Sequence, residues 1–233
     1  MVEVENLRFA WPRAGHDCLA IDRLHIAAGS TLFLYGPSGG GKSTLLALLA
    51  GVLVPQAGRV SLLGTDWSQL SGARRDALRA DHVGYIFQQF NLLPYLNLLD
   101  NVLLPCRFSH ARRERAARRN GGMRDEACSL LSRVGLPEAL WRRRASELSV
   151  GQQQRVAAAR ALIGAPELVI ADEPTSALDA PLREGFMDVL LGECRRAGST
   201  LVFVSHDERL ASRFDAQLSL AEINRAVPVE AVA

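Results

Sequence analysis

The 233-residue sequence predicts an α/β fold in one compound domain, residues 1–233. Strand and helix patterns alternate in the first and last thirds of the chain, which predicts a mostly parallel sheet flanked by helices. Alternating apolar residues near the N-terminus predict an antiparallel β subdomain there. The middle of the chain, from about residue 90 to about residue 160, is helical and irregular, so we expect an inserted α-helical subdomain.

The first third is expected to run from strands into a loop and a helix. Val2 and Val4 alternate with charged residues, and Leu19–Ile26 alternates again, as in half-buried strands. Thr31–Tyr35 is a short apolar run before a glycine, which is typical of a buried strand that feeds a loop. Ser43–Ala50 contains helix formers and no breaker, so we expect a helix there.

The remaining elements follow the same reasoning. Further strands are expected at Gly58–Leu63, His82–Phe87, Leu168–Ala171 and Thr200–Ser205. Further helices are expected at Ser71–Ala80, Met123–Val134, Gln152–Ile163 and Leu182–Ala197. Asn91–Asn101 contains Pro94 and has little periodicity, so it reads as a loop with a short helix, and Val227–Ala233 reads as a frayed tail.

Composition excludes several classes of protein. The formal net charge of +2 is too close to zero to indicate a nucleic-acid partner. The four cysteines have no metal-ligand spacing and are expected to be reduced thiols in a cytosolic protein. No apolar run approaches the roughly 20 residues of a membrane span, and the N-terminus lacks a signal-peptide pattern. Any membrane contact is therefore expected to be indirect, through a separate partner.

A glycine-rich loop follows the strand Thr31–Tyr35. Its sequence fits G-x-x-x-x-G-K-[ST], and the expected nucleotide-binding residues are Gly36, Pro37, Ser38, Gly39, Gly40, Gly41, Lys42, Ser43 and Thr44. Glycines let backbone N–H groups surround phosphate oxygens, and the following helix directs its positive end at them. Lys42 is expected to reach the β- and γ-phosphates and Ser43 to bind Mg²⁺. A plain glycine turn would need neither side chain, so the loop predicts ATP binding by a P-loop NTPase core.

Two carboxylates and a histidine follow later strands. Asp172 and Glu173 end the apolar run Leu168–Ala171, where Asp172 would hold Mg²⁺ and Glu173 would polarise a water molecule. Two ordinary surface carboxylates are the alternative, which the upstream P-loop disfavours. His206 follows a strand end, on the ligand side of a parallel sheet, although a lone histidine is more often structural.

The segment Leu148–Arg155 contains a helix start that suggests a second anion site. Ser149 is suited to cap the following helix, and Gly151 lies in the first turn. One chain with two phosphate-binding devices suggests that two chains share each nucleotide.

Together these residues resemble the ATP-binding subunit of an ABC transporter, from about Val2 to Asp215. The motifs follow the family's order: Walker A at Gly36–Thr44, the Q-loop glutamine at Gln88, the LSGGQ signature at Leu148–Gln152, Walker B at Leu168–Glu173, the D-loop at Ser176–Asp179 and the switch histidine at His206. One position departs from the pattern, because Val150 replaces the first glycine of the signature. Phe87–Pro94 and Asp100–Val102 resemble the branch of lipoprotein-releasing, macrolide-exporting and cell-division ATPases.

The resemblance implies a role for each site residue. Catalytic roles fall to Lys42, Gln88, Glu173 and His206. Magnesium ligands would be Ser43, Gln88 and Asp172. Ser149, Gly151 and Gln152 would contact the nucleotide of a second copy, and Trp11 would stack on adenine, with Phe9 as the alternative.

The resemblance also implies partners and a location. Two copies would pack head to tail around ATP and drive an integral-membrane permease, from the inner face of the cell membrane. A same-fold ATPase that signals across the membrane without moving cargo is the alternative. A soluble ABC ATPase on DNA or ribosomes usually carries tandem units or coiled coils, which this chain lacks, and a small-molecule kinase would leave Ser149–Gln152 unexplained.

The basic run Arg107–Arg119 has two interpretations. One is a solvated helix with excess arginine. The other is contact with anionic lipid headgroups.

Overall fold

The structure is a computed structural model that describes residues 1–176 and 178–226. Val227–Ala233, expected to fray, lies outside the described residues. The chain divides into two compact units: unit 1 comprises Met1–Arg79 and Val202–Ala233, and unit 2 comprises Ala80–Leu201. Within the described part of the chain, no helix is both long enough and apolar enough to cross a membrane.

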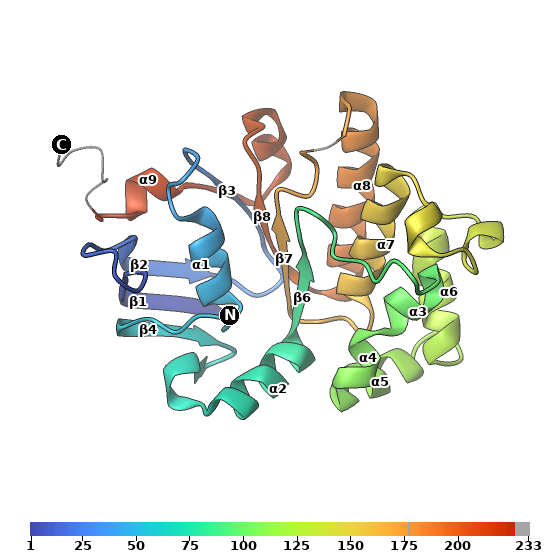
Figure 1. The fold of residues 1–233 in the computed structure, drawn as a ribbon, viewed down its shortest axis with the longest axis horizontal. Helices are drawn as coiled ribbons and strands as arrows, with labels where there is room; N and C mark the ends of the chain where they lie inside the picture. Colours follow the sequence, from blue (N-terminus) through green and yellow to red (C-terminus); the bar gives the residue numbers. More distant parts are fainter. Residues whose placement is uncertain (177, 227–233) are drawn as a thin grey trace. The chain divides into compact units, whose positions relative to one another are not determined.

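Unit 1 contains a four-stranded antiparallel sheet in the order β2-β1-β4-β5 (Figure 1). The strands are β1 (Val2–Phe9), β2 (Leu19–Ile26), β4 (Ala57–Leu62) and β5 (Thr65–Asp66). Val4 lies opposite Leu24 on β2 and Val60 on β4, and all three side chains are buried. The alternation of apolar residues in the sequence therefore places one face of this sheet against the core, and the predicted antiparallel subdomain is confirmed.

Unit 1 also supplies β3 (Thr31–Tyr35), which pairs in parallel with β9 (Ala216–Ser219). The Asp215 carboxylate accepts hydrogen bonds from the Thr31 amide and hydroxyl, which fixes the start of β3 beside the start of β9. Around these strands lie α1 (Lys42–Leu49), α9 (Leu220–Ile223), the 3₁₀ helices η1 (Trp67–Gln69) and η4 (Glu208–Arg213), and the helix α2 (Gly72–His82), which runs into unit 2.

Unit 2 is built on two parallel strands, β6 (Val83–Ile86) and β7 (Leu168–Asp172). Its helices are α3 (Leu98–Leu103), α4 (Pro105–Phe108), α5 (His110–Ala117), α6 (Met123–Arg133), α7 (Val150–Leu162) and α8 (Ala180–Ala197), with 3₁₀ helices η2 (Glu138–Leu140) and η3 (Ala145–Glu147). Helix α7 packs against β6, α3 and α8 (Figure 1). The strand β8 (Thr200–Val204) crosses the boundary between the units, and the strand order of the parallel sheet is β6-β7-β8-β3-β9.

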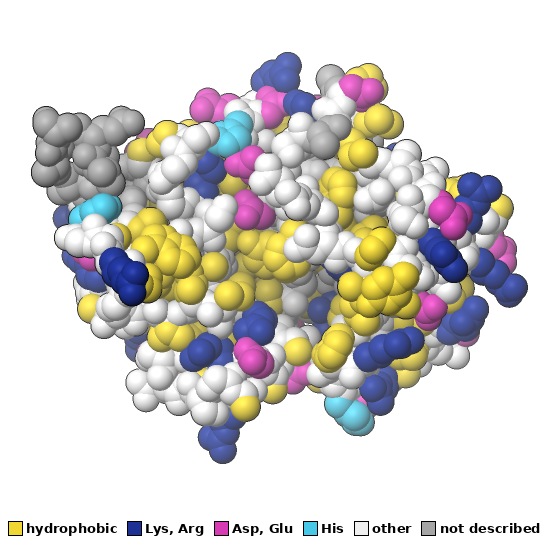
Figure 2. Space-filling view, in the orientation of Figure 1, with side chains coloured by type: hydrophobic (Ala, Val, Ile, Leu, Met, Phe, Trp, Pro, Cys, Tyr) yellow, Lys and Arg dark blue, Asp and Glu magenta, His cyan; other side chains and the backbone are white. Residues whose placement is uncertain are grey.

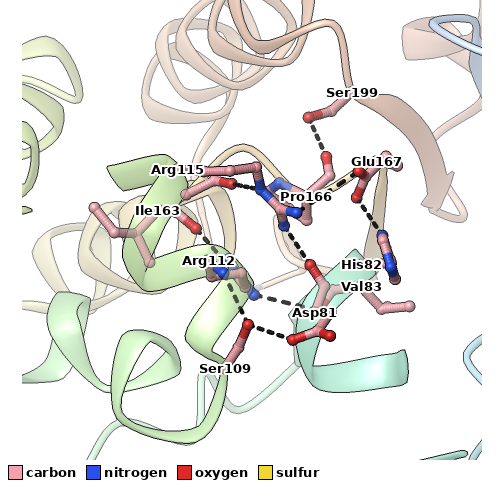
Figure 3. Close-up of polar contacts among 11 residues, drawn as sticks. Asp81, His82, Val83, Ser109, Arg112, Arg115, Ile163, Pro166, Glu167 and Ser199 are labelled. Carbon is pink, nitrogen blue, oxygen red and sulfur yellow. Dashed lines mark hydrogen bonds and ion pairs between the residues drawn. The ribbon is translucent and has the colours of Figure 1, made fainter. Parts of the chain in front are cut away.

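The basic run Arg107–Arg119 is not a uniformly solvated helix. The Arg112 side chain is buried and donates hydrogen bonds to the carbonyls of Val83 and Ile163 (Figure 3). It also donates to the Ala161 carbonyl. Burial lowers the pKa of Arg112 to about 10, so the guanidinium stays charged at neutral pH. Both interpretations of the run are therefore wrong for Arg112, because its charge stabilises the end of α7 and reaches neither solvent nor lipid.

Arg115 extends this network. Its Nε donates to the Gly164 carbonyl at 2.7 Å, and its Nη2 donates to the Asp81 carbonyl. The Asp81 carboxylate in turn accepts from Ser109, which caps α5 (Figure 3). Two arginines of α5 thus join that helix to the start of β6 and to the turn after α7.

Candidate nucleotide-binding site

The glycine-rich loop connects β3 to α1 in unit 1. Lys42, the first residue of α1, is buried and folds back over the loop. Its Nζ donates to the carbonyls of Gly36 and Pro37, each at 2.9 Å. The ammonium group is therefore held above the loop by two carbonyl oxygens, and a phosphate that arrives there meets a preorganised positive charge.

The loop backbone requires glycine at Gly41. This residue is the N-cap of α1 with φ of 92°, a left-handed conformation that other residues rarely adopt. A Cβ there would also lie 2.9 Å from the Leu19 side chain. Gly41 has no side chain that could cap the first N–H groups of α1. They are therefore available to an anion at the positive end of the helix dipole.

The two hydroxyl residues after Lys42 have different surroundings. Ser43 is exposed, so its hydroxyl is accessible to a ligand. Thr44 is buried and accepts a hydrogen bond from the Cys18 thiol, with the two atoms 3.8 Å apart. This contact joins the start of α1 to the segment that precedes β2, and nothing in the sequence pattern indicated it.

The two aromatic candidates for adenine stacking also differ. The Trp11 side chain is 47% exposed, whereas Phe9 is buried. The rings meet edge to face, with centroids 5.3 Å apart and an interplanar angle of 88°. The edge-to-face contact with Phe9 holds the Trp11 ring, and the exposed part of the indole can stack on a flat ligand.

In unit 2, Gln88 follows β6 and Asp172 ends β7, and these two strands are parallel neighbours. Tyr85 and Ile86 of β6 lie opposite Ile170 and Ala171 of β7, so Gln88 and Asp172 follow the same edge of the sheet. The Tyr85 hydroxyl donates to the Asp172 carboxylate at 3.5 Å. Burial, together with the nearby Asp172 charge, raises the pKa of Tyr85, so the phenol remains a donor.

Glu173 adopts an unusual backbone conformation. Its φ of 46° places a non-glycine residue in the left-handed region. The chain turns there directly after β7, and the Ser176 amide donates to the Glu173 carbonyl at 3.2 Å. Strained residues of this kind concentrate at functional sites. Ser176 begins the predicted D-loop, of which Ala177 lies outside the described residues.

The start of α7 carries Ser149, Val150, Gly151 and Gln152. Ser149 Oγ accepts from the Gln152 amide at 3.3 Å, and Gln152 Oε1 accepts from the Ser149 amide at 3.1 Å. These two bonds form a capping box, which is why α7 begins two residues before the expected Gln152. The Val150 side chain takes no part in the cap and is 47% exposed.

Comparison with known proteins shows the family of the chain. Residues 20–176 match the family model described as ABC transporter. The chain belongs to this family. The predicted resemblance is confirmed, and with it the α/β fold and the nature of the enzyme, which binds and hydrolyses ATP.

The relatives of this ABC ATPase cover nearly the whole chain. It is 41% identical over 222 residues to "Uncharacterized ABC transporter ATP-binding protein YbbA" of Escherichia coli (strain K12), which covers 94% of each chain. It is 40% identical over 224 residues to "Lipoprotein-releasing system ATP-binding protein LolD" of Novosphingobium aromaticivorans, which covers 95% of this chain and 96% of the relative. The predicted likeness to the lipoprotein-releasing branch is therefore confirmed.

A solved structure shows the same fold. The ATP-binding cassette MJ0796, in a dimeric post-hydrolysis state bound to ADP and Pi, matches the ABC ATPase with a TM-score of 0.80 and 32% sequence identity. The match covers 98% of this chain and 99% of that chain.

The candidate residues of the ABC ATPase belong to both units. The P-loop, Trp11 and His206 belong to unit 1, and His206 is an exposed residue two positions beyond β8. Gln88, Asp172, Glu173 and the signature Ser149–Gln152 belong to unit 2.

One further contact escaped the sequence analysis. Arg160, in the last turn of α7, is buried and donates to the carbonyls of Phe90 and Asn91 in the Q-loop. The only signal in the sequence was an arginine within the apolar stretch Val156–Leu162. Sequence periodicity cannot tell such a buried arginine from an exposed one.

Proposed function

We propose that this ABC ATPase works as a nucleotide-sandwich homodimer that drives an integral-membrane permease of the lipoprotein-releasing or macrolide-exporting type. One observation carries the proposal: the chain has two helix starts suited to anions, Gly41–Lys42 in unit 1 and Ser149–Gly151 in unit 2. Two anion-binding helix starts for one nucleotide fit an arrangement in which one chain contributes the start of α1 and a second copy contributes the start of α7. The dimeric state of the related cassette MJ0796 supports this arrangement.

Within each shared site, the proposed roles follow from the position of each group. Trp11 stacks on adenine, while Lys42 and the loop amides bind the phosphates. Glu173 polarises the attacking water, and His206 holds the γ-phosphate and water in place. Ser149, Gly151 and Gln152 of the second copy complete the contacts to the γ-phosphate.

The donor set also fits a magnesium ion. Ser43 offers an exposed hydroxyl, Asp172 a carboxylate at the end of β7, and Gln88 an amide oxygen at the same sheet edge. A small number of protein oxygen donors suits Mg²⁺, because this ion retains several water ligands and also binds substrate phosphates. When bound, the ion neutralises charge on the β- and γ-phosphate oxygens.

The helical stretch from about residue 90 to about residue 160 is the proposed subdomain that meets the permease. Its surface carries two strongly exposed aromatic side chains, Tyr95 after the Q-loop and Phe108 at the end of α4. Arginine side chains gather where Figure 1 draws α4, α5 and α6 (Figure 2). We place the protein in the cytoplasm, peripheral on the inner face of the membrane, and held there by the permease.

Trapping the ATP-bound dimer tests this proposal. The variant Glu173→Gln keeps the shape of the side chain but removes the base, so ATP should bind and persist. Gel filtration with ATP and Mg²⁺ should show a dimer for this variant and a monomer without nucleotide. The double variant Lys42→Ala, Glu173→Gln is the matched control and should stay monomeric. A Glu173→Gln protein that remains monomeric at saturating ATP would contradict the shared site.

A further inference from the structure

Helix α7 connects two segments of the proposed site. Its first turn follows Ser149, the N-cap in the signature, and its last turn carries Arg160. Thirteen residues of helix span about 20 Å, at 1.5 Å per residue. The helix is therefore a rigid link between the signature and the segment that Arg160 contacts.

Arg160 holds the Q-loop. Its Nη1 donates to the Asn91 carbonyl and its Nη2 to the Phe90 carbonyl, each at 2.5 Å. The side chain is only 8% exposed, and no carboxylate among residues 1–176 and 178–226 forms an ion pair with it. Burial lowers the pKa of Arg160 to about 10, so it remains protonated at neutral pH. A buried cation is costly without partners, so these carbonyls are essential acceptors for it.

The two carbonyls belong to a strained turn that also contains Gln88. Phe90 and Asn91 have φ values of 58° and 48°, which are uncommon for residues other than glycine. The turn is closed by the Phe90 amide, which donates to the Phe87 carbonyl at 2.9 Å, and the Phe90 side chain is buried. Such a conformation persists only where its surroundings enforce it, and the Arg160 fork supplies that constraint.

We propose that Arg160 is a positioning residue that fixes the Q-loop turn to the signature helix, so that Gln88 stands at its working distance from the nucleotide. This inference rests on the role proposed for Gln88. The planar guanidinium of arginine suits this role, because its two terminal nitrogens donate to two consecutive carbonyls at once. Lysine would keep the charge but lose the fork.

The same helix offers a matched control. Arg155, five residues earlier on α7, also donates from one guanidinium to two consecutive carbonyls, those of Val134 and Gly135, each at 3.3 Å. These carbonyls end α6 and lie outside every candidate motif. Arg160→Lys and Arg155→Lys therefore each remove from the same helix a guanidinium that holds two consecutive carbonyls. Arg160 does so at the Q-loop through two nitrogens, and Arg155 does so away from it through Nη1 alone.

The experiment measures steady-state ATP hydrolysis by the full-length chain, titrated with ATP and separately with Mg²⁺. We expect Arg160→Lys to lower kcat about tenfold and to raise the Mg²⁺ midpoint several-fold, while KM for ATP changes less than about twofold. Arg155→Lys should leave both parameters within about twofold of the original protein. Equal effects of the two variants, or a kcat loss in Arg160→Lys that only follows a lower melting temperature, would overturn the inference. Arg160→Gln, which buries no charge, replaces the lysine variant if that protein does not fold.

A double-mutant cycle with Gln88→Ala separates this inference from the role of Gln88 itself. If Arg160 acts through Gln88, the double variant should hydrolyse ATP no more slowly than Gln88→Ala alone. Additive losses would overturn the inference and leave Gln88 in its role. Normal hydrolysis and Mg²⁺ dependence in Gln88→Ala would overturn the proposed role of Gln88, and the inference with it.

Discussion

The starts of α1 and α7 are both suited to anions, but they are completed in different ways. At α1, Gly41 leaves the first amides without a side-chain cap, and Lys42 adds a charge held by two loop carbonyls. At α7, Ser149 and Gln152 already satisfy each other's amides, and no lysine follows. From this difference we predict that α1 binds phosphate strongly on its own, whereas α7 adds contacts only where a nucleotide is already held.

The largest effect expected from this contrast is at Lys42. Lys42→Ala removes the only lysine of the chain and leaves the Gly36 and Pro37 carbonyls without their donor. Loss of a preorganised charged donor should lower kcat/KM for ATP about 100-fold or more. Calorimetric titration with ATP should show the binding defect directly. Unchanged ATP affinity would contradict the assignment of α1 as the primary phosphate site.

A smaller effect is expected at Ser149. Ser149→Ala removes the cap hydroxyl of α7, which should cost about 1 kcal/mol of stability and lower kcat about tenfold. ATP binding by the monomer should stay unchanged, because the P-loop, the start of α1 and Trp11 of the same chain are expected to hold the nucleotide. Urea unfolding, ATP titration and turnover measure the three quantities separately. If Ser149→Ala weakened ATP binding by the monomer, the contrast between the two helix starts would fail.

The smallest effect is expected at Val150, where the sequence departs from the family pattern. The exposed Val150 side chain takes no part in the capping box, so Val150→Gly should change kcat by less than about twofold. Glycine in the first turn should destabilise α7 by at most about 1 kcal/mol. Steady-state turnover and urea unfolding measure both values. A large gain in turnover would mean that valine impairs the second helix start, which would sharpen the contrast further.

Local patterns predicted most elements closely, because they depend on neighbouring residues. The strand Thr31–Tyr35 was predicted with its observed bounds, and α1 differs from Ser43–Ala50 by one residue at each end. The short strands β5 and β9 were missed, since two or four residues carry too little periodicity and their pairing partners are distant in sequence.

The sequence motifs also indicated the candidate residues. The hydrogen bonds that the structure forms around them could not be predicted from the motifs. Arg112 and Arg160 look like surface residues in sequence, yet both are buried against carbonyls of segments at least 29 residues away. The left-handed backbone of Glu173 likewise has no local signal in the sequence. The roles of Arg160 and Glu173 in ATP hydrolysis remain predictions.

Mixing two defective variants tests the central claim, the shared site, most directly. In a head-to-tail dimer, a Lys42→Ala chain and a Ser149→Arg chain together form one intact site. The Ser149→Arg chain contributes its P-loop to this site, and the Lys42→Ala chain contributes its signature. Each variant alone should be nearly inactive, and an equimolar mixture should recover a substantial fraction of the original ATPase activity. Activity of the mixture that merely equals the average of the two separate variants would contradict the account, because each chain would then carry a complete site of its own.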